Sequence, residues 1–123
     1  MKNDKRVGAV KAATPPVFGF NKERRDLAKD QFIDVGIAEE HAAALCSGIA
    51  KAGGKPVWGV NSSFLQRTFD QVSHDICLNS SPVTILVFSS SIYGMSDVTH
   101  LGIYDIPLIS NIPNLVYLSP TCV

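Results

Sequence analysis

Two adjacent acidic residues, Glu39 and Glu40, stand where a short apolar run gives way to a long segment rich in alanine. The apolar run is Phe32–Val35, and Gly36 separates it from the later segment, so the pattern predicts a β-strand that leads into a helix. A carboxylate there lies at the positive end of the helix dipole and at the carboxyl end of a strand, where open α/β sheets usually bind ligands. Proton transfer or ligand binding is therefore one interpretation. The second interpretation is that both are ordinary helix residues, and position alone favours it because acidic residues are common in first helical turns.

Further candidate residues lie downstream. Phe64 begins a predicted helix that runs to Leu78, and from the pattern alone it is equally well a core aromatic residue or a ring that stacks on a ligand. Arg67 belongs to the same helix and lies away from its apolar face. His100 falls in a long polar loop, Ser89–Gly102, and long loops are frequent positions for functional residues.

The composition excludes several classes of function. A chain of 123 residues predicts one domain, and its eleven basic and eleven acidic residues cancel. It therefore has no electrostatic footprint for nucleic acid or for an anionic membrane. No run approaches the length needed to span a bilayer, and the N-terminal segment lacks the apolar core of a signal peptide, so we expect a cytoplasmic protein.

The cysteines indicate reduced thiols and no metal site. There are three, without a CxxC spacing, which suits a cytosolic protein better than a disulfide framework. Cys77 lies three residues after His74 on a predicted helix, which is half of the ligand set that a metal ion needs. Because no second pair accompanies them, we expect a partly buried helix face there and no metal.

Strands that alternate with helices predict an α/β fold, with a mostly parallel sheet of about five strands and helices on both faces. The predicted strands are Arg6–Ala13, Phe32–Val35, Lys55–Val60, Val83–Phe88 and Asn114–Leu118. The predicted helices are Lys22–Asp30, Ala38–Lys51, Phe64–Leu78 and a short helix within Ile103–Ser110.

Three local patterns refine this fold. Val83–Phe88 is apolar throughout, which is typical of a strand covered on both faces. Asn21 and Asn61 each precede a predicted helix and are candidate N-caps. Spacing of 3.6 residues in the helix that begins at Phe64 predicts a buried face made of Leu65, Phe69, Val72 and Ile76.

The strings around the candidate residues resemble those of a known family. In chain order they are FIDVGIAEEHA, SSFLQRTFDQVSHDI, PVTILV, THLGIYD and IPNLVYLSP. From Val7 to Pro120 the chain is similar to the central pyrimidine-binding domain of 1-deoxy-D-xylulose-5-phosphate synthase, one of the transketolase-like thiamine diphosphate enzymes. The resemblance implies a single pyrimidine-binding domain over residues 1–123, incomplete at its C-terminus because the final helix and strand of such domains are missing.

The resemblance assigns roles to four residues. It implies that Glu39 shares a proton with N1′ of the cofactor's aminopyrimidine, which favours the imino form of the 4′ amino group, while Glu40 points elsewhere on the helix. It implies that Phe64 stacks on the aminopyrimidine and that Arg67 lies in the same pocket wall. His100 matches a histidine that the family places close to the reacting substrate.

The chain also departs from the family pattern. Where members carry Asp-Arg-Ala-Gly after the apolar strand, this chain has Phe88–Ser91, so Ser89 replaces an arginine that helps to hold the substrate phosphate. Ser96 replaces an aspartate, and Asn61 replaces a tyrosine. The Gly-Asp-Gly motif that these enzymes use to bind the diphosphate and Mg²⁺ on a separate domain is not present in the sequence.

These features lead to one leading hypothesis and two alternatives. We expect thiamine diphosphate to be bound here by its pyrimidine end only, with Mg²⁺ on a partner domain. The partner would be a second copy in a homodimer, a chain bearing the diphosphate-binding domain, or both. The expected reaction of the assembly is pyruvate decarboxylation and two-carbon transfer to a small aldehyde acceptor, in isoprenoid precursor synthesis, with no activity of the chain alone. The alternatives are a non-catalytic, degenerate interaction module, and a split transketolase-like enzyme with a non-phosphorylated acceptor.

Overall fold

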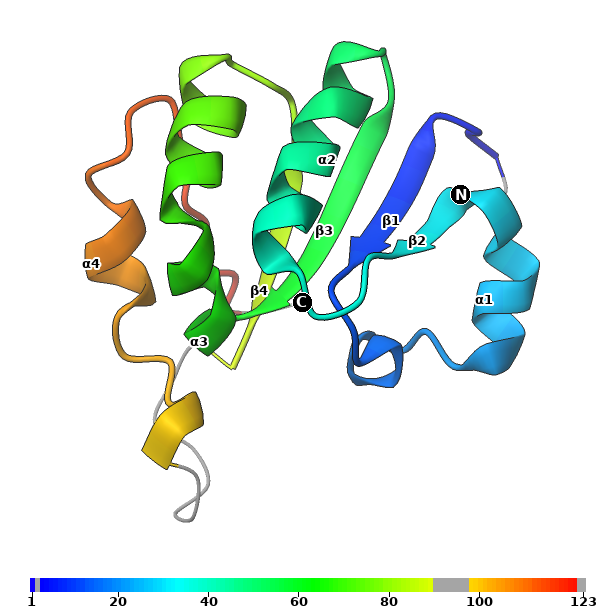
Figure 1. Cartoon of the computed structure of the whole chain (residues 1–123), viewed down its shortest axis with the longest axis horizontal. Coiled ribbons are helices and arrows are strands. Elements are labelled where there is room, and N and C mark those ends of the chain that lie inside the picture. The colour runs from blue at the N-terminus through cyan, green and yellow to red at the C-terminus, as the bar shows by residue number, and fades with distance from the viewer. Residues whose placement is uncertain (2, 90–97, 122–123) are drawn as a thin grey trace.

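The structure is a computed structural model that describes residues 1, 3–89 and 98–121. Within these residues the protein has a parallel sheet of four strands. Its strands are β1 (Val7–Lys11), β2 (Phe32–Asp34), β3 (Lys55–Asn61) and β4 (Thr84–Phe88), in the order β2-β1-β3-β4. All three pairings are parallel. The predicted α/β class with a parallel sheet is confirmed (Figure 1).

The predicted fifth strand, Asn114–Leu118, is wrong. These residues form no strand although they run close to β4, where they line a cavity with it. Asn114 has a left-handed backbone (φ 62°), and its side-chain amide donates to the Cys77 carbonyl at 3.3 Å. The segment is therefore tied to the helical turn that contains Cys77 instead of pairing with the sheet, and Val116 and Leu118 remain largely exposed.

The helices follow the predicted order but differ in length. They are η1 (Pro15–Phe18), α1 (Lys22–Ala28), η2 (Lys29–Gln31), α2 (Glu39–Lys51), α3 (Ser62–Leu65), η3 (Gln66–Thr68), η4 (Gln71–Leu78), η5 (Val98–His100) and α4 (Asp105–Ile109). The helix predicted for Phe64–Leu78 is divided into α3, the 3-10 turn η3 and the π-helical η4. As predicted, the Asn21 side chain caps α1, whereas the Asn61 side chain makes no capping hydrogen bond to α3.

The hydrophobic core lies on one face of the sheet. Figure 1 shows α2 and the helical segment that begins with α3 side by side over this face. The core consists mainly of Val10, Trp58 and Val60 from the strands, Ala42, Ala43 and Cys46 from α2, and Leu65, Val72 and Ile76 from the following helical segments. Burial of these apolar side chains is the main stabilising contribution to the fold.

Two burial predictions are wrong. Phe69 is 38% exposed while Thr68 is fully buried, because the backbone changes from 3-10 to π-helical turns there and the 3.6-residue spacing no longer applies. β4 is not covered on both faces, since Leu86 and Phe88 are 47% and 43% exposed. The strand lies at the edge of the described sheet, and its exposure alternates along its length.

The opposite face of the sheet carries the connection between β1 and β2. The Phe18 ring at the end of η1 packs edge-on against Phe88 of β4, with ring centroids 4.4 Å apart. It also lies over Gly59 of β3, where an added Cβ would come within 2.6 Å of the ring. The short helix η1 therefore covers part of this face, which agrees with the prediction that helical segments lie on both sides of the sheet.

Candidate active site

The start of α2 is positioned by hydrogen bonds at the carboxyl ends of β1 and β2. Asp34 ends β2, and its Oδ1 accepts from the backbone N–H of Ala13 at 2.9 Å and of Gly36 at 3.0 Å. Gly36 has φ 73°, a backbone conformation that glycine adopts without strain. These contacts fix the turn that brings Glu39 to the first position of α2, at the ligand-binding edge of a parallel sheet.

The structure separates the two acidic residues. The Glu39 side chain is only 4% exposed, whereas that of Glu40 is 42% exposed. A buried carboxylate needs a compensating charge or hydrogen bonds, and a surface carboxylate does not. Glu39 is thus the residue whose environment requires a specific partner.

Arg67 is that partner within the described residues. Its Nη1 lies 3.3 Å from Glu39 Oε2, and its Nε lies 3.6 Å from Glu40 Oε1. The Glu39 contact is an ion pair without hydrogen-bond geometry, because Glu39 Oε2 has no hydrogen-bond donor among the described residues. One oxygen of a buried carboxylate is therefore left able to accept a proton or a hydrogen bond.

Phe64 and His100 form a second contact pair. Their ring centroids lie 5.2 Å apart with the planes nearly perpendicular, at 88°. Phe64 is half-buried and packs against the core, while His100 is exposed and its Nδ1 lies 2.8 Å from the Thr99 hydroxyl. Because Phe64 and Arg67 are three residues apart on continuous helical backbone, the two pairs lie close to one another. The four predicted site residues are brought together, while their roles stay predictions.

Sequence reasoning missed several buried polar groups near the same edge. Asn61 Oδ1, Ser62 Oγ and Asp105 Oδ2 are buried and have no hydrogen-bond partner within the described residues. Asn61 and Ser62 end β3 and begin α3, and Asp105 begins α4, which contacts α3. An acidic residue at a helix start predicts only a dipole interaction, so the burial of Asp105 could not be predicted from its position in the sequence.

Lys11 was also missed. It lies at the carboxyl end of β1 and is only 4% exposed, and its ammonium donates to the Gly59 carbonyl at 3.1 Å. Burial lowers the pKa of Lys11, and the negative charges of Glu39 and Asp34 partly offset this effect. A lysine within an otherwise apolar strand was the signal, since lysine is rarely buried.

The departures from the family pattern are only partly described. Ser89 follows β4 and has a left-handed backbone (φ 61°), and Asn61 is the last residue of β3. Ser96 and its neighbours lie outside the described residues.

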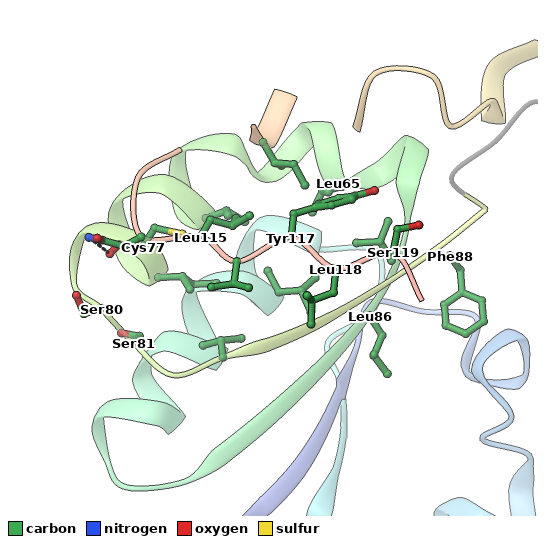
Figure 2. A pocket seen from close by; sticks show the side chains of 18 of the residues that line it. Leu65, Cys77, Ser80, Ser81, Leu86, Phe88, Leu115, Tyr117, Leu118 and Ser119 are labelled. Carbon is green, nitrogen blue, oxygen red and sulfur yellow. Dashed lines mark hydrogen bonds between the residues drawn. The ribbon is translucent and has the colours of Figure 1, made fainter. Parts of the chain in front are cut away.

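The larger of two described cavities lies away from these residues. It measures about 810 Å³ and lies between η4, β4 and the segment 114–120, as Figure 2 shows. Leu65, Cys77, Leu115 and Tyr117 line it, and neither cavity is lined by any of the four predicted site residues. Its position matches that of the predicted fifth strand, so it reflects the lack of strand pairing at this edge.

Residues 1, 3–89 and 98–121 contain neither a cluster of metal ligands nor a helix that could span a membrane. No group of three or more histidine, cysteine, aspartate and glutamate side chains is arranged there to hold a metal ion. No helix in the same residues is both long and apolar enough to cross a membrane.

Comparisons with known proteins give the class of this domain. Residues 1–122 match the family described as "Transketolase, pyrimidine binding domain", and the chain belongs to this family. A solved structure described as "Split gene transketolase, inactive beta4 tetramer" has the same fold, with a TM-score of 0.72 over 92% of this chain and 36% of that one, at 19% identity.

Relatives with curated names are more specific. The chain is 45% identical over 122 residues to the 1-deoxy-D-xylulose-5-phosphate synthase of Clostridium perfringens, which covers 99% of this chain and 20% of that protein. It is 45% identical over 121 residues to the enzyme of the same name from Clostridium botulinum, which covers 98% of this chain and 19% of that protein. The chain thus spans about one fifth of the length of the curated relatives it matches.

Proposed function

We propose that this chain is the pyrimidine-binding part of a thiamine diphosphate-dependent transferase similar to 1-deoxy-D-xylulose-5-phosphate synthase, completed by a partner that carries the diphosphate-binding domain. Membership of the pyrimidine-binding family supports the cofactor, and the identity to synthases of that name supports the reaction. The assembly would decarboxylate pyruvate and transfer two carbons to an aldehyde acceptor, a step of isoprenoid precursor synthesis.

The buried Glu39 carboxylate is the main support for this proposal. It lies at the carboxyl edge of the sheet, and its Oε2 has an ion pair with Arg67 but no hydrogen-bond donor among the described residues. A ring nitrogen that shares a proton with this oxygen would satisfy it, so the residues fit the aminopyrimidine end of the cofactor. Thiamine diphosphate, when bound, supplies a carbon nucleophile for the reaction. Glu39 would hold the proton that passes to and from N1′, and Arg67 would keep the carboxylate oriented.

Phe64 would orient the cofactor, and His100 would orient the substrate. The half-buried Phe64 ring is held by the core on one side, so it offers a fixed surface for stacking. The perpendicular contact with His100 places an imidazole beside that surface, and the Thr99 hydroxyl restrains the orientation of the imidazole. His100 is exposed and would lie on the substrate side of the cofactor.

Exposed apolar residues near this edge support the need for a partner. Ile37, two residues before Glu39, is 79% exposed, and Tyr104 and Ile106 at α4 are 64% and 56% exposed. Exposed large apolar side chains often mark surfaces that another chain or domain covers. We infer that the partner covers these residues and contributes the Mg²⁺ and diphosphate ligands.

A non-phosphorylated acceptor is a second candidate for the substrate. Ser89 directly follows β4 in place of the arginine expected from the resemblance, and a serine cannot provide the bidentate contact that arginine makes with a phosphate. Comparing an aldose phosphate with its non-phosphorylated counterpart as acceptors would separate the two substrates.

Complementation with a transketolase-like diphosphate-binding domain tests the proposal. Pyruvate decarboxylation should require both chains, Mg²⁺ and thiamine diphosphate. E39Q should lower the rate of pyruvate decarboxylation by about a hundredfold or more, which is the effect expected when a proton-transfer group is lost. E40Q is the matched control, because Glu40 is adjacent but half-exposed, and it should keep most of the activity. Formation of the complex with no cofactor binding would instead support the interaction-module alternative.

A further inference from the structure

The smaller cavity, of about 230 Å³, lies on the face of the sheet opposite α2. Four aromatic rings line it, those of Phe18, Phe20, Phe32 and Phe88, together with Val57 of β3. Phe18 contacts Phe88 and Phe20 contacts Phe32, with ring centroids 4.4 and 4.9 Å apart. Two aromatic pairs therefore form part of the wall of the cavity.

The strand register places these side chains on the same face. Successive residues of a strand point to opposite faces of the sheet, and Val10 and Trp58 belong to the core against α2. Their neighbours Lys11 and Val57 thus point the other way, into the lining of the cavity. Figure 2 shows Phe88 extending from β4 on the side away from Tyr117 and Leu118.

Lys11 is the only charged side chain among the described residues that line this cavity. Its ammonium donates to the Gly59 carbonyl at 3.1 Å and lies 3.9 Å from the centroid of the Phe18 ring. Among the described residues, no carboxylate oxygen lies within 4.0 Å of the Lys11 ammonium, so Lys11 has no ion pair there. An ammonium has three N–H donors, and one carbonyl with one ring compensates only part of the cost of its burial. The charge is stabilised from a distance by Glu39 and Asp34, without direct contact.

We propose that this cavity binds a small organic monocarboxylate whose carboxylate pairs with Lys11 and whose apolar body lies among the four rings. Charge complementarity selects the anion, because an ion pair next to apolar walls is stronger than one in water. The lining selects the rest of the ligand, because the rings and Val57 offer apolar contact.

The volume of the cavity limits the size of the ligand. An apolar cavity of about 150 Å³ is large enough to bind benzene. A cavity of about 230 Å³ therefore has room for one phenyl-sized group and a carboxylate. A dicarboxylate would bring a second charge against the rings, so a single carboxylate is the better match.

Titration of the full chain with phenylacetate, followed by ¹H–¹⁵N NMR, tests this inference. Amide signals of β1, β3 and the residues around Phe18 should shift, and 2-phenylacetamide, the neutral counterpart, should bind about tenfold or more weakly, as expected for loss of a charged hydrogen bond. K11M should weaken phenylacetate binding to the same degree. K51M is the control, because Lys51 is an exposed lysine at the end of α2 and its loss should leave binding unchanged.

A second variant keeps the test decisive if K11M does not fold. V57F fills the cavity and retains Lys11, so it should abolish the shifts without removing the charge. Equal binding of acid and amide, unchanged binding by K11M or V57F, or no shift of these signals in the wild-type chain would each overturn the proposal. The titration needs neither thiamine diphosphate nor a partner chain, so its outcome is independent of the proposed transferase function.

Discussion

Removing Arg67 should destabilise the chain through the carboxylate that Arg67 neutralises. Breaking a buried ion pair costs about 3–5 kcal/mol, because one charge is left without compensation, whereas an exposed pair contributes about 0–1 kcal/mol. The pair at 3.3 Å is intermediate, since the Glu39 side chain is 4% exposed and that of Arg67 is 47% exposed. We therefore expect R67M to lower the free energy of unfolding by about 1–3 kcal/mol at neutral pH.

A double-mutant cycle isolates this interaction. Urea unfolding of the wild type, R67M, E39Q and R67M/E39Q gives the coupling free energy, and we expect about 1–2 kcal/mol, with the double variant more stable than R67M. The same cycle with E40Q in place of E39Q should give a coupling free energy of less than about 0.5 kcal/mol, because the Arg67 and Glu40 side chains are both about half-exposed. A coupling with Glu39 no larger than that with Glu40 would refute the view that Arg67 serves chiefly to neutralise Glu39.

Three further predictions concern the rest of the fold. Hydrogen bonds from Arg6 hold the pKa of Asp4 well below its usual 3.8. The ionised Asp4 carboxylate therefore stabilises the fold above that pH, and this contribution is lost as the pH falls below it. The difference in unfolding free energy between wild type and D4N should shrink between about pH 6 and pH 3. Burial raises the pKa of the Cys46 thiol to about 12, so mass spectrometry should detect alkylation of Cys46 by iodoacetamide at neutral pH only after unfolding. I76A should cost about 2–5 kcal/mol in urea unfolding because Ile76 is 5% exposed, while I37A, at a side chain 79% exposed, should change stability by less than about 0.5 kcal/mol.

The parallel sheet and its order of elements could be predicted from local patterns. Apolar runs, glycine turns and the Asn21 cap are short-range signals, and they located every strand of the described sheet within about two residues. The failures depend on neighbours that are distant in the chain. Whether Asn114–Leu118 pairs as a strand depends on contacts with β4 and Cys77, and whether Phe88 is covered depends on what lies beside an edge strand.

The site shows the same division between local and distant information. The position of Glu39 after a strand could be predicted, and the resemblance separated it from Glu40. Its burial and its contact with Arg67 could not be derived from spacing, because they depend on how α2 packs against η3. Lys11 was missed for a related reason: only the fold brings Gly59 and Phe18 to its ammonium.

Binding of the pyrimidine end of the cofactor tests the central proposal most directly. In an NMR titration of this chain with thiamine, which lacks the diphosphate, we expect weak binding at millimolar concentrations and shifts centred on Glu39, Phe64, Arg67 and His100. E39A should abolish these shifts and E40A should retain them. Shifts that persist in E39A, or a wild-type chain whose signals at these residues do not respond to thiamine, would contradict the assignment of Glu39 as the aminopyrimidine-binding residue.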